Sequence, residues 1–133
     1  IVGRRLPALG TASGRVILAT WSEDEIAHAV ASWPIRAVTP RTVVDRQAID
    51  GEIAQAAQDG YSITQGQMIL NEISIAVPIT GIDGRANAAL QVAVSSHSFD
   101  IRRVKEVLLP ALLDTAGGIP GEALSNEPRP GSR

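Results

Sequence analysis

The sequence predicts an α+β fold in which an antiparallel sheet is flanked by helices. Apolar residues recur every three or four positions in residues 22–33, 45–59 and 100–116, which is the period of an α-helix. Between the last two of these segments the period changes to two, which is typical of β-strands. Glycine-containing turns separate the segments, and a length of 133 residues suits a single domain.

The composition excludes several classes of function. Fourteen acidic and 12 basic residues leave a net charge of −2, which argues against a surface that binds nucleic acid by neutralising phosphates. The chain has no cysteine and only two histidines, so we expect no disulfide, no metal site and no cofactor. Charges interrupt every apolar run before the roughly 18 to 20 residues that span a bilayer. We expect a protein that does not enter the membrane and that works in the reducing cytoplasm.

The first helix is expected to follow a loop over residues 6–15 and to continue through residues 16–19. Small residues at a helix start leave the N–H groups of the first turn accessible, and the helix dipole there favours an anion such as a carboxylate. Close packing of the helix against a neighbour explains the same small residues equally well.

Two further helices carry clear end signals. Ser22 and Glu25 form a capping box that begins a helix, and Pro34 ends it. A helix over residues 45–59 ends at Gly60, which supplies the left-handed stop. We expect the last helix to run from residue 100 to residue 116 and to bend at Pro110, where one hydrogen bond is lost.

Strict alternation predicts an antiparallel hairpin over residues 73–80 and 86–95, joined by a turn at residues 81–84. One face is aliphatic and should pack against helices. The other face carries small and polar side chains, which suits either the floor of a small-molecule pocket or a solvent-exposed sheet face. We favour the pocket because a run of alanines is unusual on a face in contact with water.

The C-terminal segment differs from the rest in composition. Residues 117–133 are rich in Gly and Pro, so we expect a flexible tail after a folded domain over residues 1–116. The chain begins with Ile1 and its only methionine is Met68, which indicates a piece of a longer product or a processed form.

No arrangement of residues indicates catalysis. A nucleophile elbow would need glycine two places on either side of Ser13, where Thr11 and Arg15 stand. His28 and His97 have no Asp or Glu at a spacing that suggests a proton relay. We therefore expect no enzyme. The alternative from that class is a hydrolase of small acids or esters that uses Ser13 or Ser74.

Several short motifs occur in an order and spacing that resemble a known family. These motifs are Val2-Gly3-Arg4-Arg5-Leu6-Pro7, Thr11-Ala12-Ser13-Gly14-Arg15, Thr39-Pro40-Arg41-Thr42, Asp59-Gly60-Tyr61-Ser62-Ile63, Ile75-Ala76-Val77-Pro78-Ile79 and Asp83-Gly84-Arg85. Through them the chain resembles the effector-binding domain of IclR-type bacterial transcriptional regulators from residue 2 to about residue 116.

This resemblance implies a GAF-like α+β domain that binds a small organic acid. It implies an N-terminal winged helix-turn-helix domain that binds DNA, and we expect that domain and the first elements of the effector domain to be absent from residues 1–133. It also implies assembly as a homodimer or tetramer. The resemblance places the effector between the start of the first helix and the small-residue face of the hairpin, on Leu6, Ala12, Ser13, Thr64, Ser74, Gln91 and Ala93.

The chain departs from the family pattern at three positions of this set and at Glu72 beside it. Relatives often have an acidic residue at the position of Thr64 and an apolar residue or glycine near Glu72, and they commonly have serine or asparagine where this chain has Gln91 and Ala93. Three further segments are Leu6-Pro7-Ala8, Gly14-Arg15-Val16-Ile17-Leu18-Ala19 and Leu108-Leu109-Pro110-Ala111-Leu112. They resemble the branch of the family that controls protocatechuate and 4-hydroxybenzoate catabolism, and this resemblance favours an aromatic carboxylate as the ligand, with a short keto acid as the open alternative. A structural dimerisation module without a ligand is the further alternative to a ligand sensor that controls oligomer arrangement.

Overall fold

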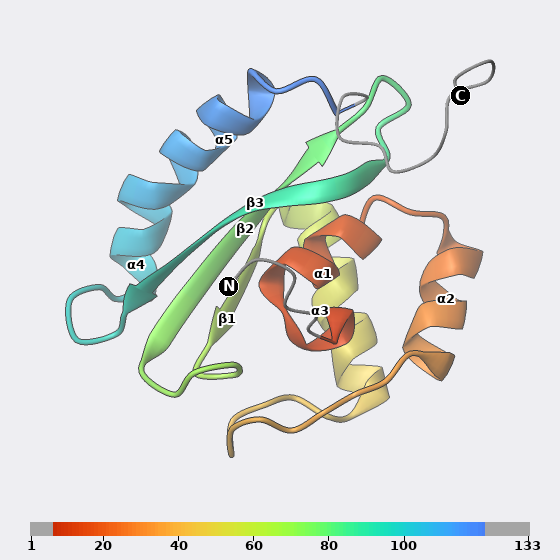
Figure 1. Cartoon of the computed structure of the whole chain (residues 1–133), viewed down its shortest axis with the longest axis horizontal. Coiled ribbons are helices and arrows are strands. Elements are labelled where there is room, and N and C mark those ends of the chain that lie inside the picture. Colours follow the sequence, from red (N-terminus) through yellow and green to blue (C-terminus); the bar gives the residue numbers. More distant parts are fainter. Residues whose placement is uncertain (1–6, 122–133) are drawn as a thin grey trace, which may run out of the picture.

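Three antiparallel strands in the order β1–β2–β3 form the sheet around which the helices pack. The computed structural model describes residues 7–121 (Figure 1). Its elements are η1 (Ala8–Gly10), α1 (Ala12–Leu18), α2 (Glu23–Ser32), α3 (Arg46–Asp59), β1 (Ser62–Gln65), β2 (Glu72–Thr80), β3 (Ala86–Ser95), α4 (Ile101–Arg103), the π-helical segment η2 (Val104–Leu108) and α5 (Leu109–Gly117). The predicted α+β class with an antiparallel sheet is confirmed.

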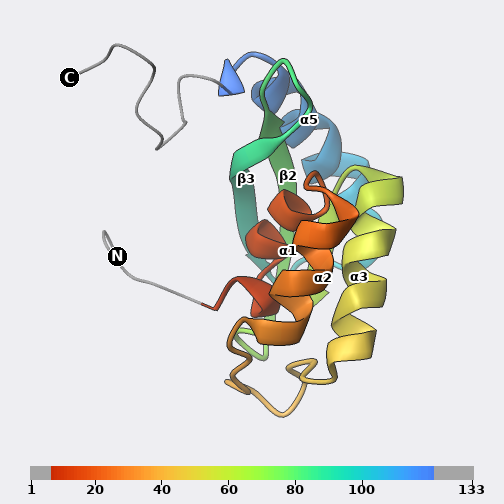
Figure 2. The same ribbon diagram turned by 90° about the vertical axis from the view of Figure 1, so that its right-hand side faces the viewer.

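The helices cover both faces of the sheet. Figure 2 shows α1, α2 and α3 together on one side, whereas Figure 1 shows α5 across the strands from them. The aliphatic side chains of β2 pack against Val104, Leu112 and Ala116 of η2 and α5. On the other side, Leu18, Ile49 and Ile53 lie at the centre of a core that joins α1, α2 and α3.

The predicted end signals of α2 and α3 are confirmed, whereas α1 begins at Ala12, inside the segment over residues 6–15 that was predicted to be a loop. The structure adds a cap there: Thr11 accepts a hydrogen bond from the Gly14 N–H at 2.9 Å. Ser22 and Glu25 form the reciprocal capping box of α2. Asp45 caps α3, which ends at Gly60 with φ of +81°, a conformation that glycine adopts without strain.

The predicted hairpin is confirmed, and β1 adds a third strand beside β2. The two faces of the hairpin differ as predicted from the alternation. Its small-residue face is used in two ways. Ala76 and Ala89 pack against Ala12 and Val16, so α1 lies close to the middle of this face. Close packing of a helix therefore explains part of the alanine pattern, and the rest borders a cavity.

The last helix is not the single bent α-helix that the sequence predicts. Asp100 caps its start by accepting from the Arg103 N–H at 2.8 Å, but the turn from Val104 to Leu108 is π-helical. In this wide turn the Leu109 N–H donates to the Val104 carbonyl, five residues earlier. Pro110 follows directly and has no N–H to donate. The π-helical turn accommodates Pro110, because in a regular α-helix the proline ring would clash with the carbonyl four residues earlier.

The end of α5 lies one residue beyond the predicted end of the last helix, at Gly117. Ile119 still packs against the sheet core, and a Cβ added to Gly121 would overlap the backbone of Thr80. Residues 122–133 of the predicted tail lie outside the described residues. Within the described part, no helix has the length and apolar character needed to span a membrane.

Candidate functional site

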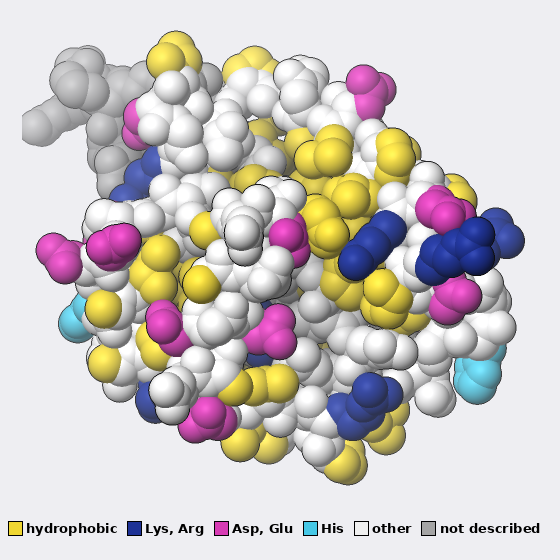
Figure 3. Space-filling view, turned by 180° about the vertical axis from the view of Figure 1, so that it is seen from behind, with side chains coloured by type: hydrophobic (Ala, Val, Ile, Leu, Met, Phe, Trp, Pro, Cys, Tyr) yellow, Lys and Arg dark blue, Asp and Glu magenta, His cyan; other side chains and the backbone are white. Residues whose placement is uncertain are grey.

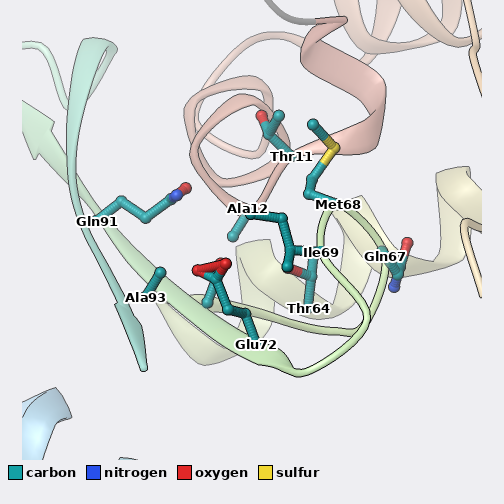
Figure 4. Close-up of a pocket in the computed structure, with 10 residues that line it drawn as sticks. Thr11, Ala12, Thr64, Gln67, Met68, Ile69, Glu72, Gln91 and Ala93 are labelled. Atoms are coloured by element: carbon teal, nitrogen blue, oxygen red, sulfur yellow. The ribbon is translucent and has the colours of Figure 1, made fainter. Parts of the chain in front are cut away.

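A cavity of about 170 Å³ opens between the start of α1, the small-residue face of the sheet and the loop that joins β1 to β2 (Figure 4). Three strands, one helix and one loop contribute to its wall. The lining residues are Thr11, Ala12, Thr64, Gln67, Met68, Ile69, Glu72, Ser74, Gln91 and Ala93.

The strand register explains why distant residues meet in this cavity. Thr64 of β1 lies opposite Ser74 of β2, and Ser74 lies opposite Ala93 of β3, so the three side chains form one row across the sheet. Glu72 and Gln91 are each two residues away along their strands and therefore point to the same face. Period-two alternation thus gathers five lining residues from three strands.

Gln91 joins β3 to the beginning of α1. Its Oε1 atom accepts one hydrogen bond from the Ser13 hydroxyl at 2.6 Å and another from the Ser13 N–H at 3.2 Å. The Gly14 N–H donates to Thr11. The expectation of free N–H groups at this helix start is therefore wrong for Ser13 and Gly14, because side chains of the protein already accept from both. Ser13 itself does not line the cavity.

The loop between β1 and β2 is held by polar contacts from two other segments. Thr39 donates its hydroxyl to the Gly66 carbonyl at 2.6 Å, and Thr42 donates its hydroxyl to the Gln67 carbonyl at 2.5 Å. Arg15 donates from Nη2 to the Gln67 side chain at 3.0 Å. Gly66 has φ of +69°, which allows the loop to turn back toward the cavity. This wall of the cavity is fixed by tertiary contacts.

Arg15 is a buried cation behind this wall. Its side chain is 0% exposed; Nε donates to the Leu9 carbonyl at 2.8 Å, and Nη1 has no hydrogen-bond partner among residues 7–121. Burial lowers the pKa of the Arg15 guanidinium, and the negative charge of Glu52 opposes that shift. Since Arg15 does not line the cavity, it supports Gln67 and brings no cation into the cavity itself.

The structure brings most of the predicted ligand residues together. Those that line the cavity are Ala12, Thr64, Ser74, Gln91 and Ala93. Ser13 lies beside it, bonded to Gln91, and Leu6 lies outside the described residues. Ligand binding by these residues stays a prediction.

Sequence reasoning missed five lining residues. Glu72 follows the same alternation as Ser74, so extending the strand by one residue would have found it. Thr11 is the cap of α1, which a search for helix caps would have found. Gln67, Met68 and Ile69 lie in a loop without periodicity, and no local signal places them in the wall.

The chemistry of the cavity is that of binding. Its polar groups are hydroxyls, amides and the Glu72 carboxylate. His28 and His97 are exposed and do not line the cavity, so neither serves as a base for Ser13 or Ser74. The described residues contain no cluster of His, Cys, Asp or Glu that could hold a metal ion.

A second depression, of about 180 Å³, lies between α3, β1, α4 and η2. Figure 3 shows the molecule from behind the view of Figure 1, where apolar surface is bordered by charged side chains. Glu52, Asp59 and Lys105 are among its lining residues, and none of the predicted ligand residues is. The first cavity is therefore the candidate site.

Comparison with known proteins relates the chain to a family of regulators. Residues 1–120 match the family described as "Bacterial transcriptional regulator IclR C-terminal". The Pca regulon regulatory protein of Pseudomonas putida is 30% identical over 112 residues, which are 84% of this chain and 38% of that protein. The chain spans between 34% and 43% of the length of such curated relatives. These curated relatives are named as transcriptional regulators, which agrees with the expectation that the chain is not an enzyme.

Two solved structures with bound hydroxybenzoates are similar to this fold. The inducer-binding domain of the PobR transcription factor from Acinetobacter, a double mutant in complex with 3-hydroxybenzoic acid, is 26% identical with a TM-score of 0.79, and the match covers 88% of this chain and 67% of that one. An IclR homolog from Microbacterium hydrocarbonoxydans in complex with 4-hydroxybenzoate is 27% identical with a TM-score of 0.74, and the match covers 88% of this chain and 48% of that one. The chain therefore belongs to the family of IclR-type bacterial transcriptional regulators and corresponds to its C-terminal domain.

Proposed function

We propose that this chain is the ligand-sensing domain of a DNA-binding transcriptional regulator and that it binds a small organic acid. The observation that carries the proposal is the cavity on the small-residue face of the sheet, which is lined by five residues predicted from the sequence. A concave site with a few convergent polar groups is what small ligands require.

The ligand class that we propose is a small carboxylate, with aromatic acids first. Support comes from the two similar structures that hold hydroxybenzoates. The Ser13 N–H is the donor for the carboxylate, and Gln91 has to turn away from Ser13 to release it. Ser74 and Gln91 then offer hydrogen bonds to the other end of the ligand.

Ligand binding to this domain regulates DNA binding by the assembled, full-length protein. The DNA-binding winged helix and the homo-oligomer belong to the whole regulator, which acts on DNA in the bacterial cytoplasm. A ligand changes the arrangement of the subunits only to the extent that it binds one arrangement better than another.

A thermal-shift screen of small carboxylates tests the proposal. Benzoate, 3-hydroxybenzoate, 4-hydroxybenzoate, protocatechuate, pyruvate and glyoxylate are the probes. A ligand at 100 times its Kd stabilises the folded state by about 2.7 kcal/mol, which a melting experiment detects. We expect at least one probe to raise the melting temperature of the parent chain.

Two variants locate the site. Ala93→Phe fills the cavity with a ring, and Ser13→Asp puts a negative charge beside the bound carboxylate; both should abolish the response. Asn87→Phe is the matched control, because Asn87 is exposed on β3 and does not line the cavity. A response of Ser13→Asp or Ala93→Phe equal to that of the parent shows that the ligand binds elsewhere.

A further inference from the structure

Glu72 is the only ionisable side chain among the described residues that line the cavity. It stands at the first position of β2, and Figure 4 shows its carboxylate oxygens directed into the cavity, between Ala93 and Ala12 in this view. The other polar groups of the lining are the hydroxyls of Thr11, Thr64 and Ser74 and the amides of Gln67 and Gln91. The described lining of the cavity therefore carries one acidic group and no basic one.

In the described part of the chain the Glu72 carboxylate accepts no hydrogen bond and forms no ion pair. Only the backbone of this residue is engaged, because its N–H donates to the Ile69 carbonyl at 3.1 Å and its carbonyl accepts from the Gly66 N–H at 2.9 Å. The nearby cation, Arg15, is committed to Leu9 and Gln67. The backbone contacts hold β2 in place while the carboxylate keeps its full capacity to accept hydrogen bonds.

A ligand that fills the cavity takes water away from this carboxylate. A desolvated carboxylate without a donor is strongly unfavourable, whereas a hydrogen bond to a charged acceptor is among the stronger ones in proteins. The occupant must therefore supply an O–H or N–H group to Glu72. If it also carries a carboxylate, that group has to lie at the opposite end, because two negative charges in a partly enclosed site repel each other.

We propose that Glu72 determines the specificity of the site, which selects small acids with a hydroxyl or amino donor opposite the carboxylate. This inference rests on the proposed function and narrows its ligand class. In this orientation the carboxylate of the ligand lies toward the start of α1 at Ser13, and its donor group lies toward Glu72.

Matched ligands measured by isothermal titration calorimetry test the inference on the 133-residue chain. The aromatic set is benzoate, 4-methoxybenzoate, 2-hydroxybenzoate, 4-hydroxybenzoate and 4-aminobenzoate, and the aliphatic pair is propionate and 3-hydroxypropionate. We expect the acids with a donor opposite the carboxylate to bind about tenfold more tightly or better than their partners, as a charge-assisted hydrogen bond implies. The hydroxyl and amino members show which donor the site prefers.

The variants assign this preference to Glu72. Glu72→Leu should remove it while leaving or improving the binding of benzoate and propionate, and Glu72→Gln, which keeps an acceptor without the charge, should retain a smaller preference. Glu23→Leu is the matched control, because Glu23 is exposed on α2 and does not line the cavity. Urea denaturation of each variant shows that the fold is intact.

Two results overturn the inference and leave the proposed function standing. One is equal affinity of the parent chain for acids with and without the donor, and the other is a preference that survives in Glu72→Leu. If no acid of either set binds the parent chain, the proposed function itself fails, and the role of Glu72 fails with it.

Discussion

Single residues decide how closely the first helix approaches its surroundings. Gly14 is buried in α1, and a Cβ at this position would overlap the backbone of Ala8. Next to it, Arg15 is fully buried and holds the Leu9 carbonyl and Gln67. The start of α1 therefore contains one residue with no side chain and one with a long, buried side chain that donates to two partners. Together they place the helix start beside the cavity.

We predict that Gly14→Ala destabilises the protein, although the same change in an open helix is stabilising. The methyl group forces the backbone of α1 and η1 apart, and overpacking of this kind costs about 1–3 kcal/mol. Urea denaturation measures the free energy of unfolding. Gly51→Ala in α3 is the control: nothing lies within 4 Å of an added Cβ there, so the variant should gain about 0.5–1 kcal/mol. Equal gains in both variants would contradict the close approach.

Contacts between elements anchor the hairpin to the helical layer. Arg85, beside the turn, forms a bidentate ion pair with Glu25 of α2, at 2.5 and 2.8 Å, and its guanidinium lies 4.3 Å from the centre of the Trp21 ring. The Ala86 N–H donates to the Thr20 hydroxyl at 2.8 Å, and Trp21 donates to the Ala86 carbonyl at 2.9 Å. The segment between α1 and α2 therefore hydrogen-bonds to the backbone at the start of β3.

This junction makes the stability of the fold depend on pH. The hydrogen bond from Arg85 lowers the pKa of Glu25 from 4.5 to about 2, with help from Ser22. A folded-state pKa below the unfolded value stabilises the fold above about pH 4.5, and this contribution is lost as the pH falls toward 2. We predict that the melting temperature falls over this range and that Glu25→Gln reduces the fall.

Circular dichroism of thermal unfolding at a series of pH values provides the measurement. Glutamine at position 25 can keep the capping box of α2, so the variant removes mainly the charge. The control is Glu106→Gln. Glu106 pairs with Arg102, which lies four residues earlier, and both side chains are exposed, so this ion pair should contribute little to stability. If Glu25→Gln and the parent lose stability in parallel between pH 5 and pH 2, the ion pair does not link the two elements as described.

At the scale of the whole molecule, the cavity depends on segments that are far apart in the chain. Thr39 and Thr42 come from the connection between α2 and α3, yet they hold Gly66 and Gln67 of the loop between β1 and β2. Thr42 is buried and also accepts hydrogen bonds from the N–H groups of Val38 and Thr39. One cavity wall is therefore held by another loop and by α1.

We predict that Thr42→Val loosens this wall and weakens ligand binding. The change keeps the shape of the side chain but leaves the buried Gln67 carbonyl without its donor, which costs about 1–3 kcal/mol. Hydrogen exchange should become faster in residues 66–70, while the amides of α5, on the other side of the sheet, keep their rates. Unchanged exchange in that loop would show that Thr39 and Arg15 hold it without Thr42.

Local patterns were enough to predict the helix starts at Ser22 and Asp45, the stop at Gly60 and both strands of the hairpin, because caps, turns and alternation involve residues close in the chain. They also separated the aliphatic face of the hairpin from the small-residue face that carries Ser74 and Ala93. Family resemblance added Thr64 and Ala12 as predicted ligand residues. The shared register of the three strands explains why these residues meet.

The remaining features depended on contacts between distant segments. Gln91 accepts from the Ser13 N–H, Thr42 donates to the carbonyl of Gln67 in the cavity wall, and the last helix widens before Pro110. Each reflects a competition between partners that are 25 to 78 residues apart or a choice among helix types of similar energy. Local sequence cannot rank such partners, because the free energy of each contact depends on which groups folding brings within hydrogen-bonding distance and removes from water.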